Sequence, residues 1–219
     1  MARLEVKYIW ELPVRATHWI NVVCILVLSV TGLFIGSPQT VALKTDQYLM
    51  GWVRFAHFTA GYIFAISVAA RVYWSFVGNE YARWRVFLPW LTAEGRVKMW
   101  EVFSFYSFLS RKVPKEVGLN AMAATAYSLV FLLYLFLIVT GFVLYAGAYP
   151  HNSVFHVLTG WVTYIVPLQW LRQAHHMTMW LLVGFVINHI YSGWLFDIRT
   201  RGKTISGIFS GYKAVRLPE

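Results

Sequence analysis

Five of the seven histidines in this sequence lie inside long apolar stretches, where an ionisable side chain is costly and therefore indicates a function. These five are His18, His57, His175, His176 and His189. Imidazole nitrogens bind iron and zinc, and they also carry protons. The other two, His151 and His156, belong to the connection before the last apolar stretch, and we expect them to be solvated or interfacial.

The spacing of the last three histidines indicates which of them act together. A helix turns by about 100° and rises about 1.5 Å per residue. The 14 residues from His175 to His189 therefore fall about 40° short of four turns, so these side chains share a face about 21 Å apart along the axis. From His176 the separation is about 140°, which directs that side chain elsewhere. We expect His175, and not His176, to work with His189.

The composition places these stretches in a membrane. The chain has 219 residues, of which 58% are hydrophobic and 13% charged, whereas soluble domains are about 25% charged. Four stretches reach the roughly 20 apolar residues that a bilayer crossing needs, namely 18–37, 52–77, 121–148 and 172–196. We expect an all-α integral membrane protein, a single domain over residues 1–219. It would be a four-transmembrane-helix bundle with short interfacial helices at 90–110 and 153–168.

The net charge of +10 is sorted by side of the membrane, which nucleic-acid binding would not require. Three segments are basic, whereas the other two connections hold only Lys44, with Arg54 and Arg172 at the neighbouring helix starts. The positive-inside rule then makes both termini cytoplasmic and the protein a multi-pass component of the inner membrane. The residues of the basic segments are Arg3, Lys7, Arg15, Arg83, Arg85, Arg96, Lys98, Arg111, Lys112, Lys115, Arg199, Arg201, Lys203, Lys213 and Arg216.

This topology sets four histidines at two depths. His18 begins the first span from the inside, at the depth of His189, and His57 begins the second from the outside, at the depth of His175. Two facing pairs of neutral imidazoles fit two haems b, each with its iron between two axial ligands. A structural zinc site needs about four clustered ligands, and no Cys or carboxylate stands near these histidines in the sequence.

Two glycines agree with stacked haems. Gly32 lies 14 residues after His18 and therefore at the outer depth, and Gly141 lies at a similar depth in the third span. Both follow Val-Thr, and both would leave room for the outer porphyrin, although small residues also serve ordinary helix packing. The single Cys24 lies within the first span, where we expect a small core residue.

Three arginines are candidates for pairing with haem propionates. Arg71, which is 14 residues after His57, lies at the inner depth, where it needs a propionate or an internal carboxylate unless it snorkels to the interface. Arg54 and Arg172 each precede a proposed outer ligand by three residues, so they are candidates for the outer propionates.

Several stretches of the sequence are specific rather than merely hydrophobic. They are "PVRATHW" at 13–19, "MGWVRFAHFTAGYIF" at 50–64, "ARVYWSFVGNEYAR" at 70–83, "VGLNAMA" at 117–123, "VTGFVLY" at 139–145 and "SGIFSGYKA" at 206–214. With these stretches the chain resembles the b-type cytochrome subunit of membrane-bound nickel–iron uptake hydrogenases, within the wider group that includes the gamma subunit of formate dehydrogenase. The resemblance covers most of the chain.

The resemblance implies two haems b, a quinone (ubiquinone or menaquinone) bound near the cytoplasmic side, and a hydrogenase whose small and large subunits face outward. It places the haem ligands at His18, His57, His175 and His189. Two positions depart from the family pattern: Arg172 replaces a frequent histidine, and Phe196-Asp197-Ile198 stands where relatives often have Glu-Asp-Ile. These departures leave the ligands intact and bear on the identity of the partner.

We therefore expect an electron-transfer subunit of a hydrogen:quinone oxidoreductase, in which electrons pass from the outer histidine pair to the inner pair and on to quinone. Alternatives are the cytochrome subunit of a formate dehydrogenase or sulfur-compound oxidoreductase, and a haem-free membrane anchor or proton-coupled transporter. Asn120, together with His18, is the candidate quinone contact, because formate dehydrogenase gamma subunits bind quinone with an asparagine in this region. The same asparagine would equally serve as a helix cap.

Overall fold

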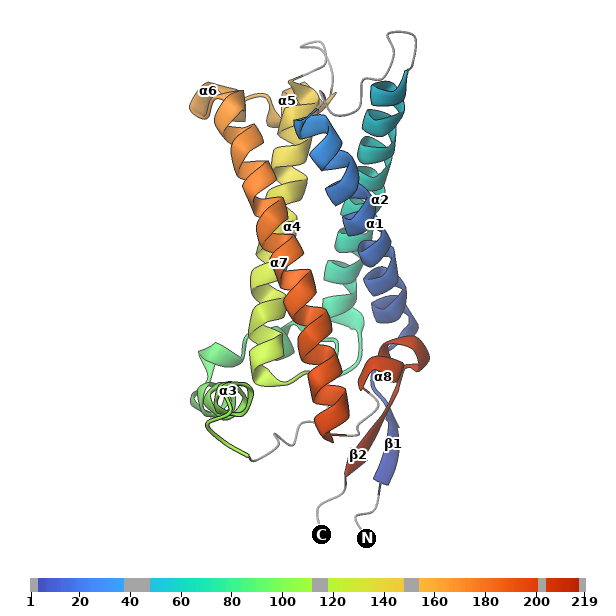
Figure 1. Ribbon diagram of the computed structural model, residues 1–219, viewed down its shortest axis with the longest axis vertical. Helices are drawn as coiled ribbons and strands as arrows, with labels where there is room; N and C mark the ends of the chain where they lie inside the picture. Colours follow the sequence, from blue (N-terminus) through green and yellow to red (C-terminus); the bar gives the residue numbers. More distant parts are fainter. Residues whose placement is uncertain (1–3, 38–47, 112–117, 148–153, 201–203, 217–219) are drawn as a thin grey trace. The chain divides into compact units, whose positions relative to one another are not determined.

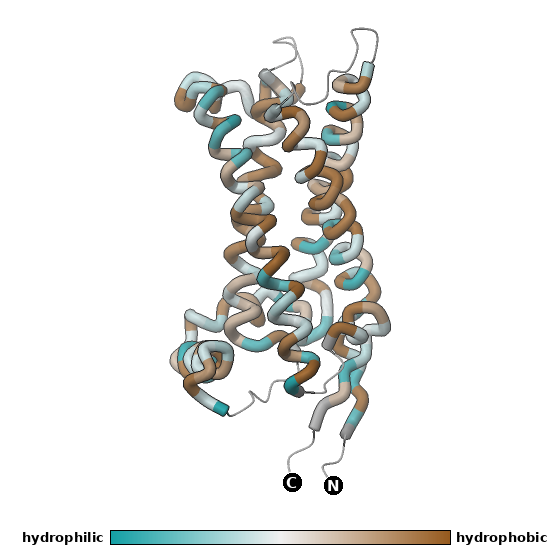
Figure 2. Tube along the Cα trace, in the orientation of Figure 1, coloured by the Kyte–Doolittle hydropathy of each residue, from teal (hydrophilic) through white to brown (hydrophobic). Residues whose placement is uncertain are grey.

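Four long apolar helices make up most of the described chain. The computed structural model describes residues 4–37, 48–111, 118–147, 154–200 and 204–216. The long helices are α1 (Leu12–Gly36), α2 (Leu49–Val77), α4 (Ala121–Ala146) and α7 (Leu168–Thr200), each long and apolar enough to cross a membrane (Figures 1 and 2). The expected class of helical membrane protein with four spans is confirmed.

Three of the four helices, α1, α2 and α7, begin three to six residues before the expected spans, because hydropathy detects only the part that suits hydrocarbon, whereas α4 begins at Ala121 as expected. Contacts within the chain divide it into two compact units. Unit 1 comprises Met1–Trp19, Ala69–Val130 and Val186–Glu219, and unit 2 comprises Ile20–Val68 and Phe131–Phe185. Each long helix contributes a segment to both units, so the single domain over 1–219 stays a prediction.

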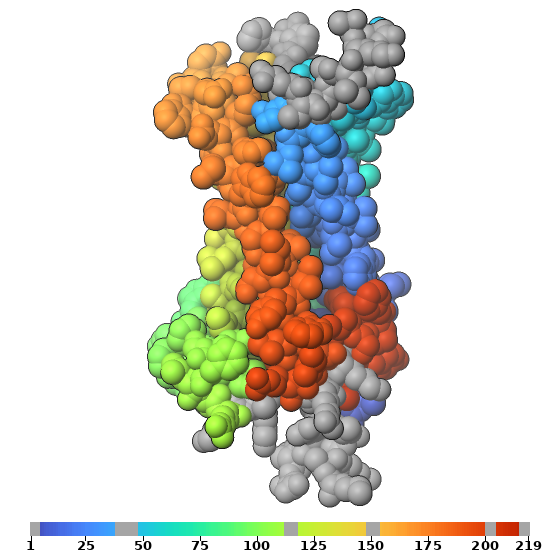
Figure 3. Space-filling view, in the orientation of Figure 1, coloured from blue at the N-terminus to red at the C-terminus, as the bar shows by residue number. Residues whose placement is uncertain are grey.

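Unit 1 contains a two-stranded ribbon that the sequence analysis did not anticipate. Strand β1 (Leu4–Tyr8) pairs antiparallel with β2 (Tyr212–Arg216), with Tyr8 opposite Tyr212 (Figure 1). The short helix α8 (Thr204–Ser210), a red patch in Figure 3, ends at Gly211, whose φ of 89° is left-handed. A side chain there would also meet the Tyr8 ring at 2.6 Å, so only glycine fits this turn. The ribbon ties the two ends of the described chain together.

A second connection in unit 1 joins the start of α1 to the end of α2. Glu11 Oε2 accepts hydrogen bonds from Trp74 Nε1 at 2.8 Å and from the backbone N–H of Asn79 at 2.9 Å. Asn79 Nδ2 in turn donates to the backbone carbonyl of Ile9 at 2.9 Å, and Ile9 is fully buried. These bonds satisfy polar groups at the helix ends and fix the entry of α1 against the exit of α2.

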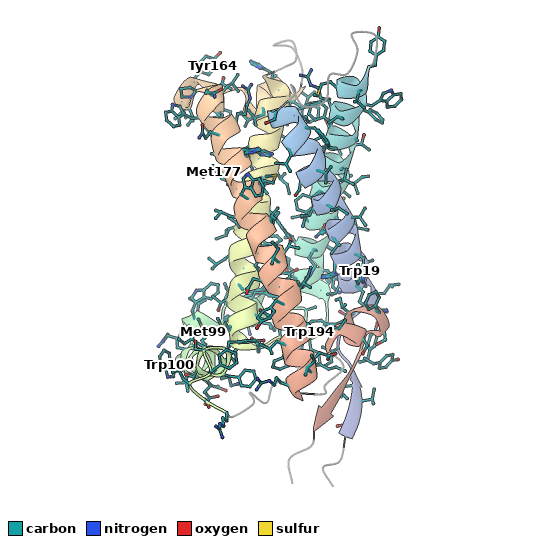
Figure 4. All side chains as sticks on the ribbon, in the orientation of Figure 1. Trp19, Met99, Trp100, Tyr164, Met177 and Trp194 are labelled. Atoms are coloured by element: carbon teal, nitrogen blue, oxygen red, sulfur yellow. The ribbon has the colours of Figure 1, made fainter. Side chains whose placement is uncertain are left out.

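The expected inner interfacial helix at 90–110 corresponds to α3 (Ala93–Tyr106), which follows the 3-10 turns η2 (Trp84–Phe87) and η3 (Pro89–Leu91). Thr92 caps α3 by accepting from the backbone N–H of Gly95 at 3.0 Å. Figure 4 marks Met99 and Trp100 on this helix. Met99 Sδ accepts from Thr125 of α4 at 3.5 Å, whereas Trp100 is exposed. An apolar exposed face on a short helix suits a membrane surface.

In unit 2 a small core joins α1, α2 and α4. Cys24, Phe64 and Val68 are buried together, so the expectation that Cys24 is a small core residue is confirmed. The partly buried residues packed against them are Ile25, Leu28, Phe131, Tyr134 and Ile138. This packing holds the segments of α1, α2 and α4 that belong to unit 2 side by side.

The expected outer helix over 153–168 is wrong in extent, because two short helices replace it. These are α5 (Val154–Thr159) and α6 (Val162–Ile165), separated at Gly160, where a side chain would lie 2.4 Å from the His156 carbonyl oxygen. Phe155 anchors α5 by stacking on Phe142 of α4, with ring centroids 5.7 Å apart. Tyr164, at the α6 end in Figure 4, is exposed. His156 is half-buried, which is compatible with the interfacial alternative of its expected role.

Some sequence-based expectations concern residues outside the described ranges. These residues are Arg3, Lys44, Lys112, Lys115, His151, Arg201 and Lys203.

Candidate cofactor site: two histidine pairs

Unit 1 brings His18 of α1 and His189 of α7 together. Their ring centroids are 6.3 Å apart, and the ring planes are inclined by 51°. His18 is half-buried and its Nδ1 has no hydrogen-bond partner within the described part of the chain, whereas His189 is exposed. The rings are therefore near neighbours without stacking on each other.

The distance between these two rings suits a metal ion held between them. Bonds from a metal to imidazole nitrogens are about 2 Å long. The centre of an imidazole lies roughly 1.1 Å from its nitrogens, given ring bonds of about 1.35 Å. Two bonds and two ring radii together span about 6 Å, which is close to the observed 6.3 Å. The separation of the two rings is therefore compatible with both imidazoles binding one iron.

Arg71 of α2 lies in the same unit as a buried cation. Only 5% of it is exposed, its guanidinium lies over the rings of Phe87 at 5.2 Å and Tyr127 at 5.7 Å, and its Nε has no partner. It forms no ion pair with a carboxylate among the described residues. A buried charge costs several kcal/mol, and a cation–π contact returns about 2 kcal/mol or less. The charge of Arg71 is therefore not balanced by any carboxylate among the described residues.

Asn120 begins α4 in unit 1 and caps it. Its Oδ1 accepts from the backbone N–H of Ala123 at 2.8 Å, so the capping role is observed. The amide nitrogen makes no hydrogen bond to any residue that the structure describes, so it is available as a donor. Lys213 lies buried beside this helix start, because its Nζ donates to the Gly118 carbonyl at 3.2 Å. No pattern in the sequence indicates this position of Lys213.

In unit 2, His57 of α2 faces the Val-Thr-Gly tripeptide of α1. Its Nδ1 lies 2.8 Å from Thr31 Oγ1. A Cβ at Gly32 would lie 3.4 Å from His57 Cε1, which is an ordinary van der Waals distance, so the ring lies close to the backbone of α1. The Thr31 hydroxyl thus contacts the Nδ1 atom of the imidazole, and the absence of a side chain at Gly32 leaves space beside the Cε1 atom.

His175 of α7 meets the second Val-Thr-Gly tripeptide, on α4, in the same manner. Its Nδ1 lies 2.8 Å from Thr140 Oγ1, and a Cβ at Gly141 would lie 3.5 Å from its Cε1. His57 lies within electrostatic range of His175. The role of both glycines was expected from the sequence, whereas the contacts of the two threonines were not. The repeated Val-Thr-Gly tripeptide is the sequence feature that could have indicated them.

His176 has different neighbours from His175. A Cβ at Gly36 would lie 3.3 Å from His176 Cε1, and the His176 ring meets Trp180 edge-on at 6.4 Å. Arg54 and Arg172 are exposed, and Arg172 donates to Gln169 Oε1 at 3.2 Å. The described contacts do not join either arginine to a histidine.

The chemistry of the donor set fits haem. Within the described residues, no three His, Cys, Asp or Glu side chains gather as a metal cluster, whereas a protein zinc site uses three or four ligands. Haem iron needs only two axial imidazoles. The orphaned Nε of Arg71 and the glycines that face His57 and His175 suit an anionic, bulky cofactor.

Comparison with known proteins agrees with this chemistry. Residues 9–211 match the model of the family described as "Prokaryotic cytochrome b561". A protein of Bradyrhizobium diazoefficiens is 41% identical over 95% of this chain and 86% of its own length, and one of Cupriavidus necator is 37% identical over 97% and 89%. Both carry the name "Probable Ni/Fe-hydrogenase B-type cytochrome subunit".

A more distant relative comes from Escherichia coli K12. It is 33% identical over 94% of this chain and 90% of its own length, and its name is "Probable Ni/Fe-hydrogenase 1 B-type cytochrome subunit". The match to the family model spans all four long helices and every described histidine. The chain therefore belongs to the prokaryotic cytochrome b561 family, as a multi-pass membrane cytochrome b similar in sequence to the B-type cytochrome subunits of Ni/Fe hydrogenases.

Proposed function

We propose that this chain is the membrane subunit of a Ni/Fe hydrogenase and passes electrons from an outward-facing catalytic partner to the membrane quinone pool. The family implies haem b, and we propose two haems in each chain. The observation that carries the proposal is the division of four histidines into two pairs, one in each unit. His18 and His189 lie 6.3 Å apart, and His57 and His175 each face a Val-Thr-Gly tripeptide.

The names of the relatives favour a hydrogenase over a formate dehydrogenase as the partner. Three proteins that are 33–41% identical, over nearly the whole chain, are named as Ni/Fe-hydrogenase subunits. Sequence similarity of this extent supports the same kind of partner, and we propose that its small and large subunits lie on the outer face. The bound haem would supply one-electron redox chemistry, which is the chemistry that links hydrogen oxidation to a quinone.

The side chains have distinct proposed tasks. The Nε2 atoms of His18, His57, His175 and His189 would bind iron, and Arg71 would pair with a propionate of the haem in unit 1. Asn120 would donate its free amide N–H to a quinone carbonyl while its oxygen caps α4. Both ends of the carboxamide are then used, so the capping role and the quinone role are compatible.

The distribution of charge supports a cytoplasmic position for unit 1. The exposed cations Arg83, Arg85, Arg96, Lys98 and Arg111 belong to unit 1, whereas the described cations of unit 2 are Arg54 and Arg172 alone. By the positive-inside rule, we propose that the surface of unit 1 faces the cytoplasm. Quinone reduction there would take up cytoplasmic protons, and hydrogen oxidation by the partner would release protons outside.

Co-purification and turnover together test this proposal. The tagged chain, extracted in mild detergent from cells grown with hydrogen and nickel, should retain Ni/Fe hydrogenase subunits and catalyse hydrogen-dependent reduction of a soluble quinone. Membranes that lack the chain should keep hydrogen-dependent reduction of an artificial dye but lose quinone reduction. Co-purification of a molybdenum-containing dehydrogenase, or unchanged quinone reduction without the chain, would contradict the proposal.

A further inference from the structure

Thr31 and Thr140, which lie beside the histidines of unit 2, each have one hydroxyl proton and can therefore donate one hydrogen bond. Thr31 Oγ1 lies 2.6 Å from the Val27 carbonyl oxygen, and Thr140 Oγ1 lies 2.7 Å from the Phe136 carbonyl oxygen. A carbonyl oxygen only accepts hydrogen bonds, so at these distances each hydroxyl must donate to its carbonyl. Each threonine therefore has only lone pairs left to present to the imidazole.

This arrangement fixes the tautomer of both histidines. Each Nδ1 lies 2.8 Å from a threonine oxygen that can only accept, so each Nδ1 must carry the proton and donate it. For His57, the Leu28 carbonyl is a second acceptor within hydrogen-bonding reach. A neutral imidazole with its proton on Nδ1 has a free lone pair on Nε2, which is the form that binds a metal.

We propose that Thr31 and Thr140 are positioning residues for the two haem ligands of unit 2, an inference that rests on the proposed ligation by His57 and His175. Each threonine selects the Nδ1–H tautomer and sets the rotation of the ring. The neighbouring Gly32 or Gly141 leaves space along the ring edge that leads to Nε2. The repeated Val-Thr-Gly tripeptide is thus one device used twice, on α1 and on α4.

The hydrogen bonds also tune the iron. An acceptor on Nδ1–H makes the imidazole more basic, and a more basic ligand favours the ferric state. Loss of the acceptor should therefore raise the midpoint potential of the haem in unit 2. It should also weaken haem binding, because second-shell partners of metal-bound histidines contribute roughly 10-fold to 100-fold in affinity.

Valine and serine substitutions separate the hydroxyl from the shape of the side chain. Thr140→Val keeps the branched shape and removes the acceptor, whereas Thr140→Ser keeps the acceptor. In the purified full chain, Thr140→Val should raise the potential of one haem, leave the other unchanged, and lower retention of the first about 10-fold during washing with apomyoglobin. Thr140→Ser should restore both values. Thr31→Val should have a smaller effect, because Leu28 offers His57 another acceptor.

Histidine variants distinguish this inference from the ligation on which it rests. If His57→Ala and His175→Ala both keep two haems, the proposed ligation fails and the positioning role falls with it. If these variants lose a haem while Thr140→Val keeps the parental potential and retention, ligation stands and the positioning role is wrong. A changed potential that Thr140→Ser does not restore would identify a packing effect and overturn the inference. Thr140→Ala serves if the valine variant fails to accumulate.

Discussion

At the scale of single residues, Arg71 is a buried cation for which we expect an anionic partner. It is 5% exposed, and it has aromatic neighbours but no ion-pair partner among the described residues. If a propionate supplies the anion, Arg71→Gln leaves that negative charge unbalanced beside the haem. We expect the potential of the haem in unit 1 to fall by roughly 50–90 mV, for a lost interaction on the order of 1–2 kcal/mol. Potentiometric titration of the purified chain measures this shift.

The matched control for this prediction is Arg71→Lys, which keeps the positive charge and should shift the potential less. Parental potentials and full haem content in Arg71→Gln would mean that Arg71 is balanced by another group and that no propionate lies beside it.

Asn120 offers a second prediction at this scale, since its oxygen caps α4 and its nitrogen makes no hydrogen bond to a described residue. Asn120→Ser and Asn120→Asp both keep a capping oxygen and remove the amide donor. We expect both variants to retain their haems and to lose most of their quinone reduction, with altered sensitivity to quinone-site inhibitors. A parental rate with parental inhibitor sensitivity in both variants would leave the cap as the only role of Asn120.

At the scale of the elements, hydropathy alone predicted the four long helices, because a bilayer crossing requires an uninterrupted apolar stretch. It could not predict the ends of α1 and α7, which continue into polar sequence at Leu12 and Thr200. The ribbon of β1 and β2 was missed for another reason. Its strands are five residues each and lie at opposite ends of the chain, so no local turn signal announces their pairing.

For the candidate site, the sequence and the structure can be compared at particular residues. Helical spacing selected His175 over His176, and the structure gives these two residues different neighbours. The contacts of Thr31 and Thr140 with the histidines were not predicted, because a threonine hydroxyl in a transmembrane helix usually donates to a backbone carbonyl of the same helix. Thr31 and Thr140 do this as well, and only the packing of neighbouring helices adds the imidazole as a second partner.

The junction of α1 and α2 allows a prediction about stability. Glu11→Ala would leave the Trp74 indole N–H and the Asn79 backbone N–H without their acceptor, which costs about 1–3 kcal/mol. We expect a lower unfolding temperature in detergent, measured by maleimide labelling of the buried Cys24 on heating. Glu11→Gln, which keeps an acceptor oxygen, should lose less. Equal unfolding temperatures for Glu11→Ala and the parent would show that these bonds contribute no net stability.

At the scale of the whole molecule, the orientation in the membrane would decide which of the two proposed haems lies nearer the proposed partner. Gln169 and Arg83 are exposed residues of unit 2 and unit 1, respectively. In intact spheroplasts, we expect an impermeant maleimide to label Gln169→Cys, and to label Arg83→Cys only after permeabilisation. Cross-linking from position 169, and not from position 83, should capture the hydrogenase subunits. The reverse pattern in either assay would invert the topology.

The central claim is that two histidine pairs hold two haems, and a redox titration of the visible spectrum tests it most directly. The purified chain should show two one-electron transitions of similar amplitude. His57→Ala or His175→Ala should remove one transition, and His18→Ala or His189→Ala should remove the other. The control, His176→Ala, should keep both. A single transition in the parent would contradict the account. So would loss of the same transition from the variants of both histidine pairs, with His176→Ala losing it as well.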